Sequence, residues 1–176
     1  INDTLCTTNY PLILFSLLYI KFPNMKPTTL HNLTWIPLMI VSFIAIVLGC
    51  AWLISDTPWL LDKEANEALL QLTFDKLFAA EINAHLPDYL TLVYRLFGWW
   101  VITIGMLLGS FVQVTKMGTT LARNTIHGVL IVMIIGFYSI EYTFIPSSPF
   151  VLLTHGITLM TGLSIWAGNK LKRFDS

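Results

Sequence analysis

The chain has 176 residues, with 10 basic and 10 acidic side chains and a formal net charge of zero. Hydrophobic residues make up 55% of it and charged residues 11%, less than half of the roughly 25% that is usual in a soluble domain. This shortage of charge excludes most soluble folds, intrinsic disorder and a basic nucleic-acid-binding module, so no nucleic-acid partner is expected. Much of the chain is therefore expected to be surrounded by membrane lipid.

Residues 1–34 are predicted to be an N-terminal tail. The apolar run from Pro11 to Phe22 is too short to cross a hydrocarbon core. Met25-Lys26, followed by polar residues and a long apolar stretch, looks like a natural start. We therefore expect residues 1–24 to be upstream sequence or a poorly ordered tail.

Four long apolar runs predict an all-α integral membrane four-helix bundle. Each is close to the 20 or so residues that a membrane-spanning helix needs, and none shows the strict alternation of an outer-membrane barrel strand. The segments that connect the last three runs are short, which predicts that consecutive helices are antiparallel neighbours. A single domain over residues 35–173 is expected, with spans at about 35–54, 96–115, 124–145 and 150–169.

Charge orients the predicted bundle. Seven of the ten basic residues precede the first span, separate the second from the third or follow the fourth, whereas seven acids lie in residues 56–88, between the first two spans. Basic segments stay on the cytoplasmic side. The sequence therefore predicts a multi-pass protein of the cytoplasmic (inner) membrane with both termini cytoplasmic.

Between the first two spans, residues 63–86 are predicted to form an amphipathic helix on the outer side. Leu70, Phe74, Phe78 and Ile82 recur at helical spacing, and Pro87 is expected to end the helix. This helix is expected to rest on the bundle as a lid at the membrane surface. The alternative is a lid that gates a substrate or docks a partner.

Ionisable side chains inside predicted spans are costly and are candidates for function. At 1.5 Å per residue, Arg95 lies ~10 Å, Glu141 ~6 Å and His155 ~8 Å from the outer ends of their helices. Tyr94 and Tyr138 fall in the same layer. These five residues form the candidate polar site.

The spacing of residues along the predicted helices indicates that the helices pack against one another at this layer. Arg95, Gly98, Ile102, Gly105 and Gly109 follow steps of three and four residues, which predicts a packing face with small residues. Comparable lines are Ser42, Ala45, Gly49 and Trp52 on the first span and His155, Thr158 and Gly162 on the fourth.

The polar layer has three interpretations. An Arg95–Glu141 pair locks the second and third spans together with His155 hydrogen-bonded nearby, or the residues line a pocket for an anionic head group or for protons. In the third, Arg95 extends to the membrane interface and contacts nothing.

No cofactor or metal is predicted. Cys6 and Cys50 show no metal-binding spacing, and Cys50 lies in an apolar run, which argues against a disulfide. His127 is expected at the cytoplasmic interface, too far from His155 to share a haem.

The segment Tyr94-Arg95-Leu96-Phe97-Gly98-Trp99-Trp100 resembles the opening of the second helix in small four-helix bacterial membrane proteins of unknown function, including DoxX-like ones. With residues 138–141 it is also loosely similar to eukaryotic sterol-biosynthesis scaffold proteins. The resemblance covers about residues 35–173 and implies a compact bundle without established chemistry or catalytic residues.

Two functions follow as hypotheses. The first is a small scaffold or accessory subunit that is not an enzyme and that associates with other membrane proteins or with itself. The alternative is a small-molecule, lipid or proton-handling membrane protein that uses the outer-leaflet polar site.

Overall fold

A computed structural model describes residues 25–172 and 174, and every regular element in this part of the chain is helical. The predicted tail over residues 1–24, with Cys6, lies outside the described residues. Four helices are long and apolar enough to cross a membrane, which confirms the all-α prediction and the number of long helices. They are α2 (Pro27–Ile54), α5 (Leu86–Thr115), α6 (Thr120–Phe144) and α7 (Pro149–Leu171).

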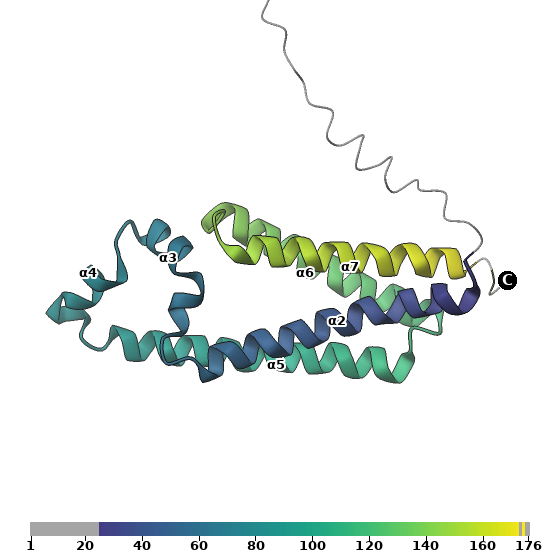
Figure 1. The fold of residues 1–176 in the computed structure, drawn as a ribbon, viewed down its shortest axis with the longest axis horizontal. Coiled ribbons are helices and arrows are strands. Elements are labelled where there is room, and N and C mark those ends of the chain that lie inside the picture. The colour runs from purple at the N-terminus through teal and green to yellow at the C-terminus, as the bar shows by residue number, and fades with distance from the viewer. Residues whose placement is uncertain (1–24, 173, 175–176) are drawn as a thin grey trace, which may run out of the picture.

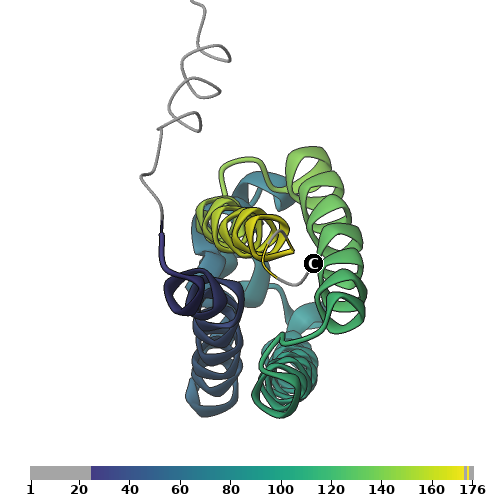
Figure 2. The same cartoon turned by 90° about the vertical axis from the view of Figure 1, so that its right-hand side faces the viewer.

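The long helices lie side by side and alternate in direction (Figures 1 and 2). α2 packs against both α5 and α7, and α6 packs against α7. One end of the bundle holds the start of α2, the α5–α6 turn and the end of α7. We name it the basic end, because it carries Lys26, Lys116, Arg123, Lys170 and Lys172.

The opposite end holds residues 55–85 and the α6–α7 turn (Figure 1). We name it the acidic end, because residues 55–88 contain seven acids and two lysines. The four helices therefore separate the two kinds of charge, as the sequence predicts.

All four long helices begin before the predicted spans. α2 starts at Pro27, eight residues before its span, so the last part of the predicted tail is helical, and α5 starts at Leu86, close to the start that the predicted depth of Arg95 assumes. Proline suits the first turn of a helix, since the amide it lacks would have no partner there. Pro87 therefore opens α5, and the prediction that it ends the preceding helix is wrong.

The predicted continuous helix over residues 63–86 is also wrong. The segment holds α3 (Lys63–Leu70), α4 (Phe74–Ala79) and η2 (Glu81–Asn83), with a break where Gln71 adopts a left-handed conformation (φ 54°), and it is preceded by η1 (Pro58–Asp62). Of the regularly spaced apolar residues, Phe74 and Phe78 pack their rings on Trp59, whereas Leu70 and Ile82 are exposed.

The α2–α5 contact is built on glycine, as the stripe on the second span predicts. A Cβ on Gly49 would lie 2.5 Å from the carbonyl oxygen of Gly98, and a Cβ on Gly98 would lie 2.7 Å from that of Gly49. Ser42 Oγ donates a 2.7 Å hydrogen bond to the Gly105 carbonyl. No larger side chain fits between these backbones, so the spacing correctly identifies the face from Gly98 to Gly109, whereas Arg95, the first residue of the predicted stripe, is exposed.

The predicted packing line on the last helix is correct only in part: His155 and Thr158 contact Tyr138 on α6, but the line is not the main buried face of the helix. His155 is exposed, and a Cβ on Gly162 would meet nothing within 4 Å. The buried face of α7 is offset around the helix and carries Thr154, Thr161, Ser164, Ala167, Gly168 and Leu171. These small and polar residues pack toward α2 and α6, next to an apolar core built around Leu38, Val112, Met117 and Leu130.

Candidate functional site

Glu141 lies one turn from the acidic end of α6 and points into the α6–α7 contact. Its side chain is 6% exposed. Oε1 accepts a 2.6 Å hydrogen bond from Thr154 Oγ1 on α7, whereas Oε2 is buried and has no hydrogen-bond partner within the described residues. A buried carboxylate thus joins the two helices through one of its two oxygens.

Tyr138 and His155 belong to the same contact. Thr158 Oγ1 donates to the Thr154 carbonyl at 2.8 Å, so the 3.2 Å contact between Tyr138 and Thr158 has the tyrosine as donor. The His155 ring stands edge-on to Tyr138, with centroids 5.3 Å apart, and its Nδ1 donates to the Val151 carbonyl. Three of the five predicted site residues therefore meet between α6 and α7.

Arg95 does not join them. It is exposed on α5, whose main packing partner is α2, while the main partner of α6 is α7. The ion pair recorded among residues 25–172 joins Lys63 to Glu67 at 3.9 Å. The predicted Arg95–Glu141 pair is therefore wrong: the two residues have similar depths but lie on helices that do not pack on each other at this level.

Tyr94 lies in a separate cluster at the acidic end. Its hydroxyl accepts a 3.0 Å hydrogen bond from Asn66 Nδ2, and its ring lies 6.3 Å from that of Trp52. Trp52 also contacts the ring of Phe150 at 5.6 Å. This cluster connects residues 55–85 to α2, α5 and α7 and shares no contact with Glu141.

A second buried carboxylate, Asp62, links this segment to the α6–α7 turn. Ser148 Oγ donates a 2.9 Å hydrogen bond to Asp62 Oδ2 and accepts one from the backbone of Phe150, which caps α7. Burial raises the pKa of Asp62 above 3.8, and the bond from Ser148 offsets part of that rise. The Ser148-Pro149 pair is a sequence signal for the cap, but nothing local indicates its partner 86 residues away.

A polar cluster at the basic end has no counterpart among the predicted site residues. His127 is buried between the helices, and its Nε2 lies 2.8 Å from Ser164 Oγ. Ser164 donates its hydrogen to the Thr34 carbonyl, so His127 donates through Nε2. These bonds join α6, α7 and α2.

Arg123 lies beside that cluster and is 1% exposed. Its guanidinium donates to the Met117 carbonyl at 3.1 Å and to Thr120 Oγ1 at 3.2 Å, which closes the α5–α6 turn. The predicted spans place Arg123 between the second and third helices. In the structure it lies in the first turn of α6, where its side chain is buried.

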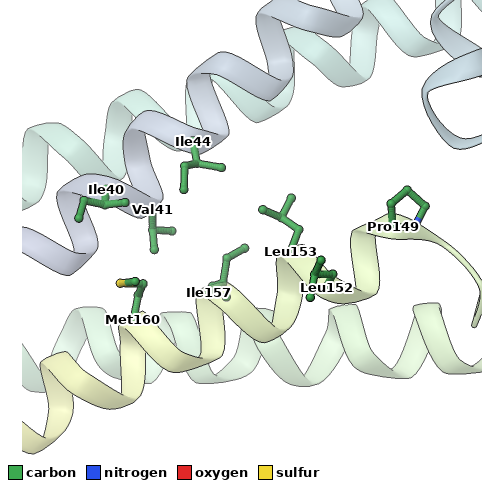
Figure 3. Close-up of a pocket in the computed structure, with 9 residues that line it drawn as sticks. Ile40, Val41, Ile44, Pro149, Leu152, Leu153, Ile157 and Met160 are labelled. Carbon is green, nitrogen blue, oxygen red and sulfur yellow. The ribbon is translucent and has the colours of Figure 1, made fainter.

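A crevice of about 370 Å³ lies between parts of α2 and α7 (Figure 3). Ile40, Val41 and Ile44 line it from α2, and Leu153, Ile157 and Met160 face them from α7. Its lining contains none of the predicted site residues. The crevice is an apolar space and not the polar pocket that one interpretation of the sequence proposed.

The described residues contain no group of three or more His, Cys, Asp or Glu side chains that could hold a metal ion. No protein-family model, curated protein or solved structure matches the chain. The candidate site is therefore defined by geometry alone: Glu141, Tyr138 and His155 with the two threonines that join them.

Proposed function

We propose that the chain is a multi-pass protein of the cytoplasmic membrane, in which α2, α5, α6 and α7 cross the bilayer. Length and apolar composition support the crossings. The basic end is assigned to the cytoplasmic side, because lysine and arginine are retained there. Both ends of the described chain are then cytoplasmic, and residues 55–85 lie outside.

We further propose that the protein acts as a small scaffold or accessory subunit rather than as an enzyme. The observation that carries this proposal is that buried polar side chains bond from one helix to the next. Examples are Ser42 to Gly105, Thr154 to Glu141, Ser148 to Asp62 and His127 through Ser164 to Thr34. Such bonds stabilise one arrangement of the helices.

Single cysteines introduced at Asp56 and Thr119, in a background that carries both Cys6→Ser and Cys50→Ser, test the topology with an impermeant thiol reagent. The proposal expects labelling at Asp56→Cys in intact cells and at Thr119→Cys only after the membrane is opened. The reverse pattern would overturn the orientation, and release of the protein by alkaline carbonate would overturn the membrane assignment.

The accessory role is tested by crosslinking in native membranes from the exposed apolar face of α6, with a photoreactive residue at Val132 or at Ile135. Discrete crosslinked protein products support it. Crosslinks to lipid alone at both positions contradict it. No cofactor, metal or nucleic-acid partner forms part of the proposal.

A second candidate, a protein that handles a small molecule or protons, is favoured by one observation: Glu141 Oε2 is buried without a partner within the described residues. Glu141→Gln separates the two candidates, with the exposed Glu81→Gln as its control. If the protein accumulates and keeps its protein partners but a lipid- or proton-linked phenotype vanishes, the scaffold proposal fails. If only abundance falls, the second candidate fails.

The resemblance to small DoxX-like four-helix membrane proteins stays a prediction. The order of the helices, the segment between α2 and α5 and the glycines of α5 are consistent with it.

A further inference from the structure

The outward face of α5 carries a groove of about 660 Å³ that no other described helix covers. Leu96, Trp99, Trp100, Met106 and Leu107 form most of its walls, with Thr103 and Ser110 along its floor. All seven residues are exposed. At 1.5 Å per residue the groove runs ~21 Å along the helix, more than half of a hydrocarbon core of ~30 Å.

Arg95 is not part of the lining but lies one helical turn before Trp99, on the side of the groove nearer the acidic end of the molecule. Its side chain is exposed, and no ion pair or hydrogen bond involving it is formed with residues 25–172. The positive charge is therefore available one turn from Trp99, beside the apolar groove. Exposed acids are absent from the groove lining itself.

This arrangement is complementary to an amphiphile with one negative head and a long chain. The guanidinium presents five donors in a planar fork that matches phosphate oxygens. The aromatic and aliphatic walls take the chain, and indole rings are common at the level of lipid head groups. A second copy placed on the same face about an axis along the membrane normal would instead bring two Arg95 side chains together.

We propose that this face of α5 binds an anionic phospholipid of the outer leaflet, with the phosphate on Arg95 and one acyl chain in the groove between Leu96 and Ser110. The inference rests on the proposed membrane insertion and orientation. It assigns Arg95 to phosphate binding in place of the predicted ion pair with Glu141.

The test reconstitutes the full chain into nanodiscs that contain equal amounts of phosphatidylglycerol and phosphatidylcholine, and measures retained lipid by native mass spectrometry. The wild-type protein is expected to retain phosphatidylglycerol preferentially. Arg95→Gln is expected to reduce that preference about fivefold, the contribution of one basic residue at an anionic surface. Lys76→Gln, which removes an exposed lysine from α4 at the same end, is the matched control and is expected to keep the preference.

Thr103→Trp fills the groove without changing charge and is expected to lower the retention of both lipids. Equal preference in wild type and Arg95→Gln, or an equal loss with Lys76→Gln, overturns the inference. Inorganic phosphate that displaces the lipid at equal concentration also overturns it, since the groove would then contribute nothing.

Failure of the underlying membrane proposal gives a different result, because a chain that does not insert enters no nanodisc at all. Thermal unfolding of each variant verifies that it is folded. Arg95→Gln is expected to fold, since the exposed side chain makes no contact that the substitution removes.

Discussion

The α2–α5 and α6–α7 contacts solve the same packing problem in different ways. The first brings two backbones together at Gly49 and Gly98, with one side-chain hydrogen bond from Ser42. The second involves helices with five glycines, of which those at positions 128, 136, 156 and 162 would place a Cβ with nothing within 4 Å, and only Gly168 lies close to the other helix, where a Cβ would be 3.1 Å from Arg123 Cδ. It is joined instead by side chains, through Thr154–Glu141, Tyr138–Thr158 and His127–Ser164.

The difference teaches that a glycine in an apolar helix does not by itself mark a contact. On α5 the glycines recur on one face and meet a matching face of small residues on α2. On α6 and α7 four of the five glycines face no neighbour, and the hydrogen bonds between these helices come from polar side chains. Substitutions that affect one contact and spare the other can therefore test the contrast.

The largest effect is expected for Gly49→Leu. Its side chain would collide with the backbone of Gly98, which cannot move without separating α2 from α5, so we expect a loss of about 3 kcal/mol in the free energy of unfolding. Thermal unfolding in detergent measures it. Gly136→Leu is the matched control, and a comparable loss there would show that leucine is harmful for reasons other than the close approach.

A smaller loss is expected for Thr154→Val. Valine keeps the shape but removes the donor to Glu141, which leaves a buried carboxyl group without its hydrogen bond and costs about 2 kcal/mol. Thr103→Val is the control, because the Thr103 hydroxyl bonds only to the Trp99 carbonyl of its own helix. Equal melting temperatures for the two variants would contradict a clamp between α6 and α7.

Tyr138→Phe should cost less, about 1 kcal/mol, because it removes one neutral hydrogen bond to Thr158 at a half-buried site. The ring stays against His155. A combined Tyr138→Phe and Thr154→Val variant measures whether the two bonds act independently. A double variant no less stable than Thr154→Val alone would mean that the tyrosine bond contributes nothing.

The smallest effect is a pH dependence at Asp62. Its pKa is raised in the folded state, so the folded protein binds this proton more tightly than the unfolded chain does. This group therefore stabilises the fold as pH falls from its folded pKa toward 3.8, and the stabilisation is absent at neutral pH.

Asp62→Asn should remove that contribution, which is measured as the change in melting temperature between neutral pH and about pH 4. Asp56→Asn, at an exposed position, is the control and should keep the wild-type change. An unaltered pH dependence in Asp62→Asn would contradict a buried, hydrogen-bonded carboxyl group.

Several features were readable from the sequence because they depend on position along a helix. The number of long helices, the sorting of charge between the two ends and the glycine face of α5 follow from run length and three- and four-residue spacing. The depths of Arg95, Glu141 and His155 follow from the rise per residue. Tyr138 and His155 do meet, with Glu141 one turn away.

Other features could be identified only from the three-dimensional arrangement of the helices. Depth along a helix does not say which helix lies opposite, and α5 packs on α2 rather than on α6, so Arg95 and Glu141 face different neighbours. The Asp62–Ser148 and Thr34–Ser164 bonds join residues 86 and 130 positions apart. Their partners are set by how the helices are arranged around one another, which no local pattern encodes.

The sequence by itself determined that this chain forms four long apolar helices with opposite charge at their two ends, because helix length and charge order are properties of contiguous segments. Only the tertiary structure decided that the two ionisable residues predicted to pair do not meet. It places Glu141 in the α6–α7 contact and leaves Arg95 on the open face of α5. The physical reason is rotational: the rise per residue fixes the height of a side chain, and the packing of the backbones fixes the direction in which it points.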